Sequence, residues 1–209
     1  MTTDRRRLRG EKTRQAILTR AAQLASAEGL EAVSLQRLAD ELGISKSGLF
    51  AHFGSKEELQ LATIEEAGRI ITDEVLRPAL KTPSGLSRIW AMCNSYLSYL
   101  ERAVFPGGCF FEATAAEFDS KPGAVRDKVL EGRGYWVKSL ARATRDAQSV
   151  GEVSAGVDPE QLAWELGCLL VGANSSFQID HSSLAFERAR RAVRDRLERV
   201  ATDSAAPLS

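Results

Sequence analysis

Residues 34–59 read SLQRLADELGISKSGLFAHFGSKEEL, a stretch that predicts two short helices separated by a glycine break. The first helix begins after Ser34, whose hydroxyl can accept a backbone N–H, and it ends at Gly43. The second helix begins after Ser45 and runs up to Gly54. Two short helices with a break of this kind have the length of a helix-turn-helix.

The apolar residues of this stretch are spaced to form one small core with a preceding helix over residues 12–28. They are Leu35, Leu38, Ala39, Leu42, Ile44, Leu49 and Phe53. The polar positions are left facing outward, and Gly48 leaves room for close approach to another surface. A short polar helix can bring hydrogen-bond donors to base edges and phosphates, so the pattern favours nucleic-acid binding. A generic helical hairpin fits the same spacing.

Helical periodicity continues through the rest of the chain, and no run of alternating β-branched residues indicates a strand. Ser55 and Glu58 form a capping box at the start of a long helix to about Leu76, with Pro78 beyond its end. Further helices are expected from Thr82-Pro83 to about Ala103, and over about 109–118, 121–149, 158–177 and 183–200. The predicted fold class is all-α: an N-terminal three-helix helix-turn-helix domain joined by a long helix to a C-terminal helical bundle, about nine helices in total.

The composition is that of an ordinary globular protein. Hydrophobic residues make up 44% of the 209 residues and charged residues 27%, and the formal net charge is zero. No apolar run approaches the roughly 18 residues that cross a bilayer, and the N-terminus leads into no signal-peptide-like apolar region. We therefore expect a cytoplasmic protein with no membrane partner. Three scattered cysteines and two histidines predict neither a disulfide framework nor a metal site.

The charge is unevenly placed, because residues 1–14 carry six basic and two acidic side chains, a net charge of +4 (six minus two). The basic residues are Arg5, Arg6, Arg7, Arg9, Lys12 and Arg14, and the acidic ones are Asp4 and Glu11. A basic arm ahead of a folded domain can neutralise phosphates or reach into a minor groove. A solvated terminus is the alternative.

From Glu11 to Leu59 the sequence closely resembles the DNA-binding domain of the TetR family of bacterial transcriptional regulators. The matching residues are Ala39, Gly43-Ile44-Ser45 at the turn, Leu49, His52-Phe53 and Ser55-Lys56-Glu57 with Leu59. Phe50 and Gly48 depart from the family pattern, which most often has Tyr at the first position and often Thr or Ala at the second. The missing Tyr hydroxyl removes one expected phosphate contact, although Phe50 can still pack on a sugar or a thymine methyl group.

The resemblance implies a basic arm plus helix-turn-helix DNA-binding domain over residues 1–54, a helical ligand-binding and dimerisation domain over 55–203, and a polar tail over 204–209. It also implies DNA contacts by Gln36, Arg37, Ser45, Lys46, Ser47, Gly48, Phe50, His52 and Lys56. Lys56 opens the next helix, where its ammonium and the helix amides can hold a phosphate. The alternative for the basic residues of this set is a solvated surface charge, and for His52 a packed or solvated side chain.

A single helix-turn-helix reads only a few base pairs, and operators are typically read by dimers. The last two predicted helices carry apolar stripes, and TetR-like proteins usually pair these two helices into a four-helix bundle with a partner subunit. The stripe residues are Leu162, Leu166, Leu169, Leu170, Ala173, Phe186, Ala189, Val193 and Leu197. The alternative is that they form only the internal core of one subunit.

The middle helices hold bulky side chains that can line a largely apolar ligand pocket with a few polar groups. The candidates for this pocket are Trp90, Asn94, Phe110, Phe111, Trp136, Asn174 and Phe177. Ordinary core packing is the alternative for each of them.

The resemblance and the charge pattern together predict a dimeric repressor that a small, largely apolar effector releases from a palindromic DNA operator, with no cofactor. Activation instead of repression fits the sequence as well. A helical interaction module without specific DNA binding is the alternative. A helical-bundle enzyme is less favoured, because the sequence has no Gly-rich phosphate loop, no Gly-x-Ser-x-Gly and no His/Glu metal motif. We therefore expect no enzymatic activity.

Overall fold

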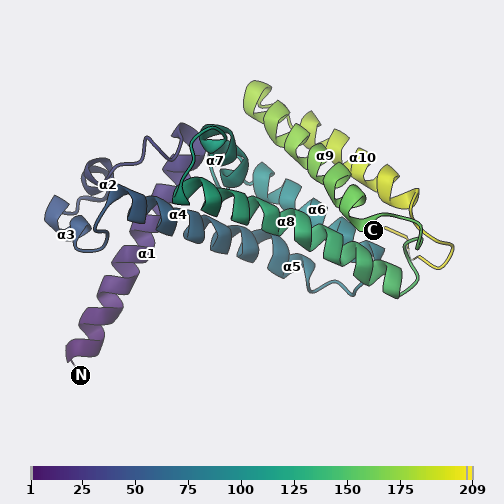
Figure 1. The fold of residues 1–209 in the computed structure, drawn as a ribbon, viewed down its shortest axis with the longest axis horizontal. Coiled ribbons are helices and arrows are strands. Elements are labelled where there is room, and N and C mark those ends of the chain that lie inside the picture. The colour runs from purple at the N-terminus through teal and green to yellow at the C-terminus, as the bar shows by residue number, and fades with distance from the viewer. Residues whose placement is uncertain (1, 206, 209) are drawn as a thin grey trace. The chain divides into compact units, whose positions relative to one another are not determined.

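The chain is 73% helical, and its helices are drawn in Figure 1. The computed structural model describes residues 2–205 and 207–208, with the backbone alone at residues 2–7, 9 and 46. In chain order the helices are α1 (Thr2–Glu28), α2 (Leu35–Leu42), α3 (Lys46–Phe50), α4 (Lys56–Ile71), the π-helix η1 (Thr72–Leu76), α5 (Arg77–Ala79), α6 (Leu86–Glu101), α7 (Phe110–Phe118), α8 (Ala124–Ser149), α9 (Pro159–Asp180) and α10 (Leu184–Glu198). Because α4, η1 and α5 follow one another without a break, the described residues form nine helices and no strand, and the predicted all-α class is confirmed. None of these helices is long and apolar enough to cross a membrane.

By internal packing the chain divides into two units. The N-terminal unit comprises Met1–Arg69 and Phe105–Gly132, and the C-terminal unit comprises Ile70–Val104 and Arg133–Ser209. The helix α7 and the first part of α8 therefore belong with α1, α2 and α3. The boundary after residue 54 that the sequence suggests divides the chain by function, and it stays a prediction.

Side-chain caps that the sequence predicts do start and stop helices. The Ser34 hydroxyl accepts the Arg37 N–H at 3.2 Å at the start of α2. The Asp158 carboxylate accepts the Glu160 N–H at 2.9 Å at the start of α9. At the end of α2, Gly43 has φ 63°, a left-handed conformation that is costly for residues with a side chain and open to glycine.

The capping box after α3 forms with one change of partner. The Ser55 hydroxyl accepts the Glu58 N–H at 3.0 Å, as the sequence predicts. The Glu58 carboxylate, however, accepts the Gly54 N–H at 2.9 Å, one residue before the expected one. The helix α3 itself ends at Phe50, earlier than expected, because a turn follows before the capping box begins.

The basic stretch at the N-terminus is helical rather than an irregular arm, because α1 already begins at Thr2. Arg, Leu, Glu and Lys are strong helix formers, and extending an existing helix adds one hydrogen bond per residue fixed. The side chains of Arg5, Arg6, Arg7 and Arg9 lie outside what the structure describes. Their phosphate contacts therefore stay a prediction.

Thr82-Pro83 is expected to begin a helix, but α6 starts only at Leu86. The Leu86 N–H donates to the Glu152 carboxylate at 2.7 Å. Gly85 before it has φ 139°, and a Cβ at this position would lie 2.2 Å from the same carboxylate. The cap of α6 is thus supplied by a residue remote in sequence, which local spacing does not reveal.

The long helix that opens with α4 continues past Pro78, which lies in its last turn and not beyond its end. The π-helix η1 precedes this turn, and the Arg77 N–H bonds to the Thr72 carbonyl. Proline lacks an N–H, and in a regular helical turn its ring clashes with an earlier carbonyl. The wider π turn accommodates it.

The core of the N-terminal unit forms where α1 meets α2 and α7. From α1, Ile17, Ala21 and Ala25 are fully buried. Of the residues predicted for this core, Leu35, Leu38, Ala39, Leu49 and Phe53 are buried, while Leu42 and Ile44 are partly exposed. Burial of one Leu or Phe side chain stabilises by about 1.5–3 kcal/mol, so these few contacts hold the short helices α2 and α3 in place.

The C-terminal unit is built around α6, which packs on η1, α5, α9 and α10. The helices α9 and α10 lie side by side (Figure 1). Arg190 of α10 donates from Nε to Asn94 at 2.8 Å and from Nη1 to Glu101 at 2.7 Å, both on α6. The Arg194 guanidinium lies 4.7 Å from the centre of the Trp90 ring. The outer helix α10 is therefore tied to α6 by polar contacts as well as by apolar packing.

Gly132→Ala is expected to destabilise the N-terminal unit, because a Cβ at this position would lie 2.2 Å from Cε1 of the buried Phe111 ring. Overpacking of this kind costs about 1–3 kcal/mol. Gly134→Ala on the same helix is the matched control, since nothing lies within 4 Å of its Cβ. That change removes a helical glycine and should stabilise by about 0.5–1 kcal/mol. Urea unfolding measures both variants, and equal midpoints would contradict the packing described.

Candidate functional site

The turn between α2 and α3 is closed by its own hydrogen bonds. The Ile44 N–H donates to the Ala39 carbonyl at 3.0 Å. The Ser45 hydroxyl caps α3 by accepting the Gly48 N–H at 3.1 Å, and its oxygen lies 3.3 Å from the Ser47 hydroxyl. The start of α3 is therefore fixed, and the hydroxyl groups of Ser45 and Ser47 lie together beside it.

Most residues predicted to contact DNA lie on the surface of this element. Gln36, Ser45 and Ser47 are exposed, Phe50 is 45% exposed, His52 is half-buried, and the side chain of Lys46 lies outside the described atoms. A Cβ at Gly48 would lie 3.0 Å from the Ser45 hydroxyl, so a larger residue there would disturb the cap. Hydroxyls, an amide, an imidazole and an aromatic ring suit contacts to base edges and to the sugar–phosphate backbone.

Arg37 is held by two carboxylates of its own chain. Its Nη2 donates to Glu28 at 2.6 Å, and its Nε donates to Glu41 at 3.1 Å. The hydrogen bonds that Arg37 donates to these carboxylates raise its pKa, the bonds to Glu28 having the larger effect. The hydrogen bond from Arg37 in turn lowers the pKa of Glu28. Three of its five N–H groups are engaged in this way, so a DNA phosphate would share this guanidinium with the carboxylates.

Lys56 opens α4, as the sequence predicts, and its ammonium is directed to Glu31. The Nζ donates to the Glu31 carbonyl at 2.8 Å and lies 3.3 Å from the Glu31 carboxylate. Gln60 donates to the same carboxylate at 3.4 Å. Burial raises the pKa of Glu31, but the hydrogen bonds from Gln60 and Lys56 outweigh it and the pKa is lowered. The lysine is thus positioned by the segment between α1 and α2.

A buried carboxylate that the sequence analysis did not single out ties α1 to α4. Glu66 is 4% exposed and accepts from the Thr19 hydroxyl at 3.1 Å and from Arg69 Nη2 at 2.7 Å. Burial raises its pKa, but hydrogen bonds from Arg69, Gln15 and Thr19 outweigh burial and lower it. Glu66 stands at a position of α4 where the helical pattern expects an apolar residue, and this departure from the pattern was the sequence signal for it.

The apolar stripes predicted as the dimer interface are buried inside the subunit. Leu162, Leu166, Leu170, Ala173, Phe186, Ala189, Val193 and Leu197 are buried, and Leu169 is partly exposed. They form the packing of α9 and α10 on each other and on α6. Leu169 keeps part of its side chain exposed and lines the hollow beside Trp164, and the assignment of these residues to a dimer interface stays a prediction.

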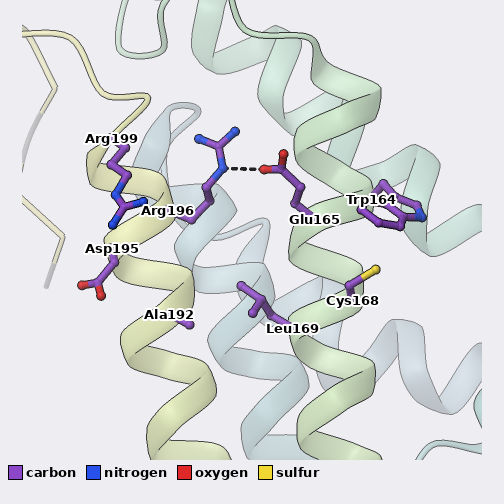
Figure 2. Close-up of a pocket in the computed structure, with 8 residues that line it drawn as sticks. All are labelled: Trp164, Glu165, Cys168, Leu169, Ala192, Asp195, Arg196 and Arg199. Carbon is purple, nitrogen blue, oxygen red and sulfur yellow. Dashed lines mark hydrogen bonds and ion pairs between the residues drawn. The ribbon is translucent and has the colours of Figure 1, made fainter.

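A neighbouring face of α9 and α10 carries exposed side chains, and Figure 2 shows the residues that line its hollow. Trp164 projects from α9 on the side away from α10 and is 62% exposed, and Ile179 further along α9 is 84% exposed. Arg196 of α10 donates to the Glu165 carboxylate of α9 across this face. The face is hollowed by about 490 Å³, lined by Trp164, Glu165, Cys168, Leu169, Ala192, Asp195, Arg196 and Arg199. It therefore combines apolar surface with charges of both signs.

The residues predicted to line a ligand pocket belong to both units. Phe110 and Phe111 are buried in the N-terminal unit, and Trp90, Asn94, Trp136, Asn174 and Phe177 belong to the C-terminal unit. The ring of Trp136 stacks on Tyr96 with centroids 5.3 Å apart, and Phe177 lies 4.7 Å from Phe186. These are core contacts, and none of the predicted residues lines the hollow beside Trp164.

The fold and the site together define an all-helical transcriptional regulator of the helix-turn-helix class. Residues 17–63 match the family model of bacterial regulatory proteins of the tetR family, and residues 85–193 match that of the tetracyclin repressor-like C-terminal domain. The second match alone covers more than half of the chain. The chain therefore belongs to the tetR family of bacterial transcriptional regulators, as its sequence resemblance implies.

Solved structures and curated relatives agree with this membership. A TetR transcriptional regulator from Chloroflexus aurantiacus superposes with a TM-score of 0.85 at 24% identity, covering 92% of this chain and 98% of that chain. AibR, in complex with isovaleryl coenzyme A and operator DNA, gives a TM-score of 0.67 at 22% identity over 86% of this chain and 94% of that one. The HTH-type transcriptional activator FasR of Mycolicibacterium smegmatis is 27% identical over 95 residues, 46% of this chain and 43% of that protein. The chain matches between 43% and 63% of the length of its curated relatives.

Gly43→Ala is expected to lower the free energy of unfolding by about 1 kcal/mol, because an alanine is strained at φ 63°. A Cβ at this position meets nothing within 4 Å, so the effect is one of backbone conformation alone. Gly43→Asn is the matched variant and should cost less, since asparagine tolerates the left-handed region. Thermal unfolding compares the two, and an alanine variant as stable as wild type would contradict the assigned turn.

Proposed function

We propose that the chain binds double-stranded DNA with α3 in the major groove, its N-terminal residues against the base edges. The observation that carries this proposal is the α2–α3 element, a capped short helix with one side packed in the core and the other exposed. Membership of the tetR family supports it. The exposed Phe50 ring supports it as well, because a sugar or a thymine methyl group would cover this apolar surface.

We propose further that two copies of the chain form the DNA-binding species and read an inverted repeat with half-sites roughly 34 Å apart. The partner would cover the open face of α9 and α10, where Trp164 and Ile179 expose apolar surface. A two-fold interface sets the same patch against itself. The face carries Asp195 beside Arg199, so it offers charges of both signs to an identical partner.

A small, largely apolar effector acting on the C-terminal unit is the regulatory part of the proposal, and Trp90, Trp136 and Phe177 are candidates to meet it there. AibR, which shares the fold, is in complex with isovaleryl coenzyme A as well as operator DNA, which supports a ligand-responsive regulator. The effector can shift the protein between conformers only by its difference in affinity for them. We propose repression as the output, in the cytoplasm and without an enzymatic reaction, with activation the alternative because FasR is an activator.

Selection of random duplex DNA by the purified protein, followed by footprinting, is expected to recover an inverted repeat. His52→Ala and Lys46→Ala should each weaken binding of the selected site by about 1–3 kcal/mol, because each removes a contact predicted at the groove. Fluorescence anisotropy with labelled operator measures the affinity. The logarithm of the binding constant should fall linearly with the logarithm of the salt concentration.

Lys81→Ala is the control for these variants, because it removes an exposed lysine from the C-terminal unit. It should bind the selected site like wild type. Failure of the wild-type protein to enrich any site at low salt would overturn DNA binding and favour the interaction-module alternative. Wild-type affinity in both α3-region variants would instead overturn the placement of the recognition surface.

Trp164→Arg is expected to convert dimers to monomers, because the partner would bury a charge where it now covers an aromatic ring. The exposed position of Trp164 means that the subunit itself should still fold. Tyr135→Arg on α8, at a position 59% exposed, is the matched control and should leave the dimer intact. Sedimentation velocity measures both, and a Trp164→Arg protein that sediments as a dimer would place the interface elsewhere.

A further inference from the structure

Glu117 at the end of α7 is bound to the backbone of the turn between α1 and α2. Its Oε2 accepts the Leu30 N–H at 2.6 Å and its Oε1 accepts the Glu31 N–H at 2.9 Å. Gly29, just before these residues, has φ 92°, and a Cβ there would lie 3.1 Å from the Glu117 carboxylate. Glycine suits both the backbone conformation and the available space, so the turn is shaped around this carboxylate.

The same turn holds the first residues of α4. The Glu31 carbonyl accepts from Lys56 Nζ at 2.8 Å, and the Leu30 carbonyl accepts from Gln60 Nε2 at 3.4 Å. The two turn residues thus donate their N–H groups to α7 and offer their carbonyl groups to α4. Hydrogen bonds in such a chain polarise and strengthen one another, most of all when the acceptor at one end carries a charge.

A second contact keeps the segment before α7 on the end of α1. The Gly107 N–H donates to the Ser26 hydroxyl at 3.2 Å. A Cβ at Gly107 would lie 1.9 Å from the Ser26 carbonyl oxygen, so the two backbones are in direct contact. With both ends of the segment 107–117 attached to residues 26–31, Glu117 meets the turn at a fixed position.

We infer that Glu117 is a positioning residue for DNA binding, acting through the turn at residues 29–31 on Lys56. This inference rests on the proposed function, because it assumes that Lys56 contacts a DNA phosphate. A carboxylate accepts both N–H groups of the turn at once, whereas an amide has one acceptor oxygen and an NH₂ group that would face a donor. Without the carboxylate the turn loosens, and Lys56 loses the carbonyl that directs its ammonium.

The test compares Glu117→Gln with Asp119→Asn, which removes an exposed carboxylate just after α7. Glu117→Gln should bind the selected operator about tenfold more weakly, the loss expected for one charged hydrogen bond, and Asp119→Asn should bind like wild type. The slope of log affinity against log salt should fall by about one, as it should in Lys56→Ala. The double variant Glu117→Gln, Lys56→Ala should bind no more weakly than Lys56→Ala alone, because the two residues act as one unit.

A merely structural role would give a different result: a lower melting temperature, an unchanged salt slope and additive losses of affinity. That result, or wild-type affinity in Glu117→Gln, overturns the inference while leaving DNA binding by the wild-type protein intact. If the wild-type protein selects no DNA, the proposed function fails first. Hydrogen exchange of wild-type protein gives a readout that needs no variant: slow exchange of the Leu30 and Glu31 amides supports the clamp, and exchange as fast as in exposed loops overturns it.

Discussion

The helix α3 spans only Lys46–Phe50, and a helix of this length does not form alone in water. The rest of the N-terminal unit therefore has to hold it. Ser45 caps its first turn, Leu49 anchors its inner side in the core, and Phe53 packs just beyond its end. The helix α1 supplies the surface on which this small core rests. Placement of the recognition element thus depends on tertiary contacts more than on helix propensity.

Local signals placed most helices, and contacts remote in sequence account for the late start of α6. Ser34, Gly43 and Asp158 act on residues close in sequence, so a pattern of a few positions is enough to identify them. Glu152 and Glu117 accept hydrogen bonds from backbone N–H groups that are far away in the sequence. No pattern of residue spacing predicts such a pairing. The start of α6 and the clamp on the turn between α1 and α2 could therefore be found only in the folded chain.

The same limit applies to the surfaces of helices. The strongest apolar stripe in the sequence of α9 contains Leu162, Leu166 and Leu170. In the folded subunit this stripe is buried in the core. The surface open to a partner carries Trp164 and Ile179 among polar and charged residues, so its periodicity is weak. Which apolar residues of a helix remain exposed can be known only once the fold shows which of them its own subunit covers.

Carboxylates restrain the cations of the N-terminal unit. Glu41 accepts from both Arg20 and Arg37, and Glu31 accepts from Lys56. An unpaired cation binds any polyanion, because the contact releases counterions from the phosphates. A cation that is already paired with a carboxylate gains less binding free energy from a phosphate placed at random. On the proposed function, DNA seated in register holds a phosphate where it can compete with these carboxylates. The pairing then weakens nonspecific binding more than specific binding, and the ratio of the two decides whether a regulator finds its site.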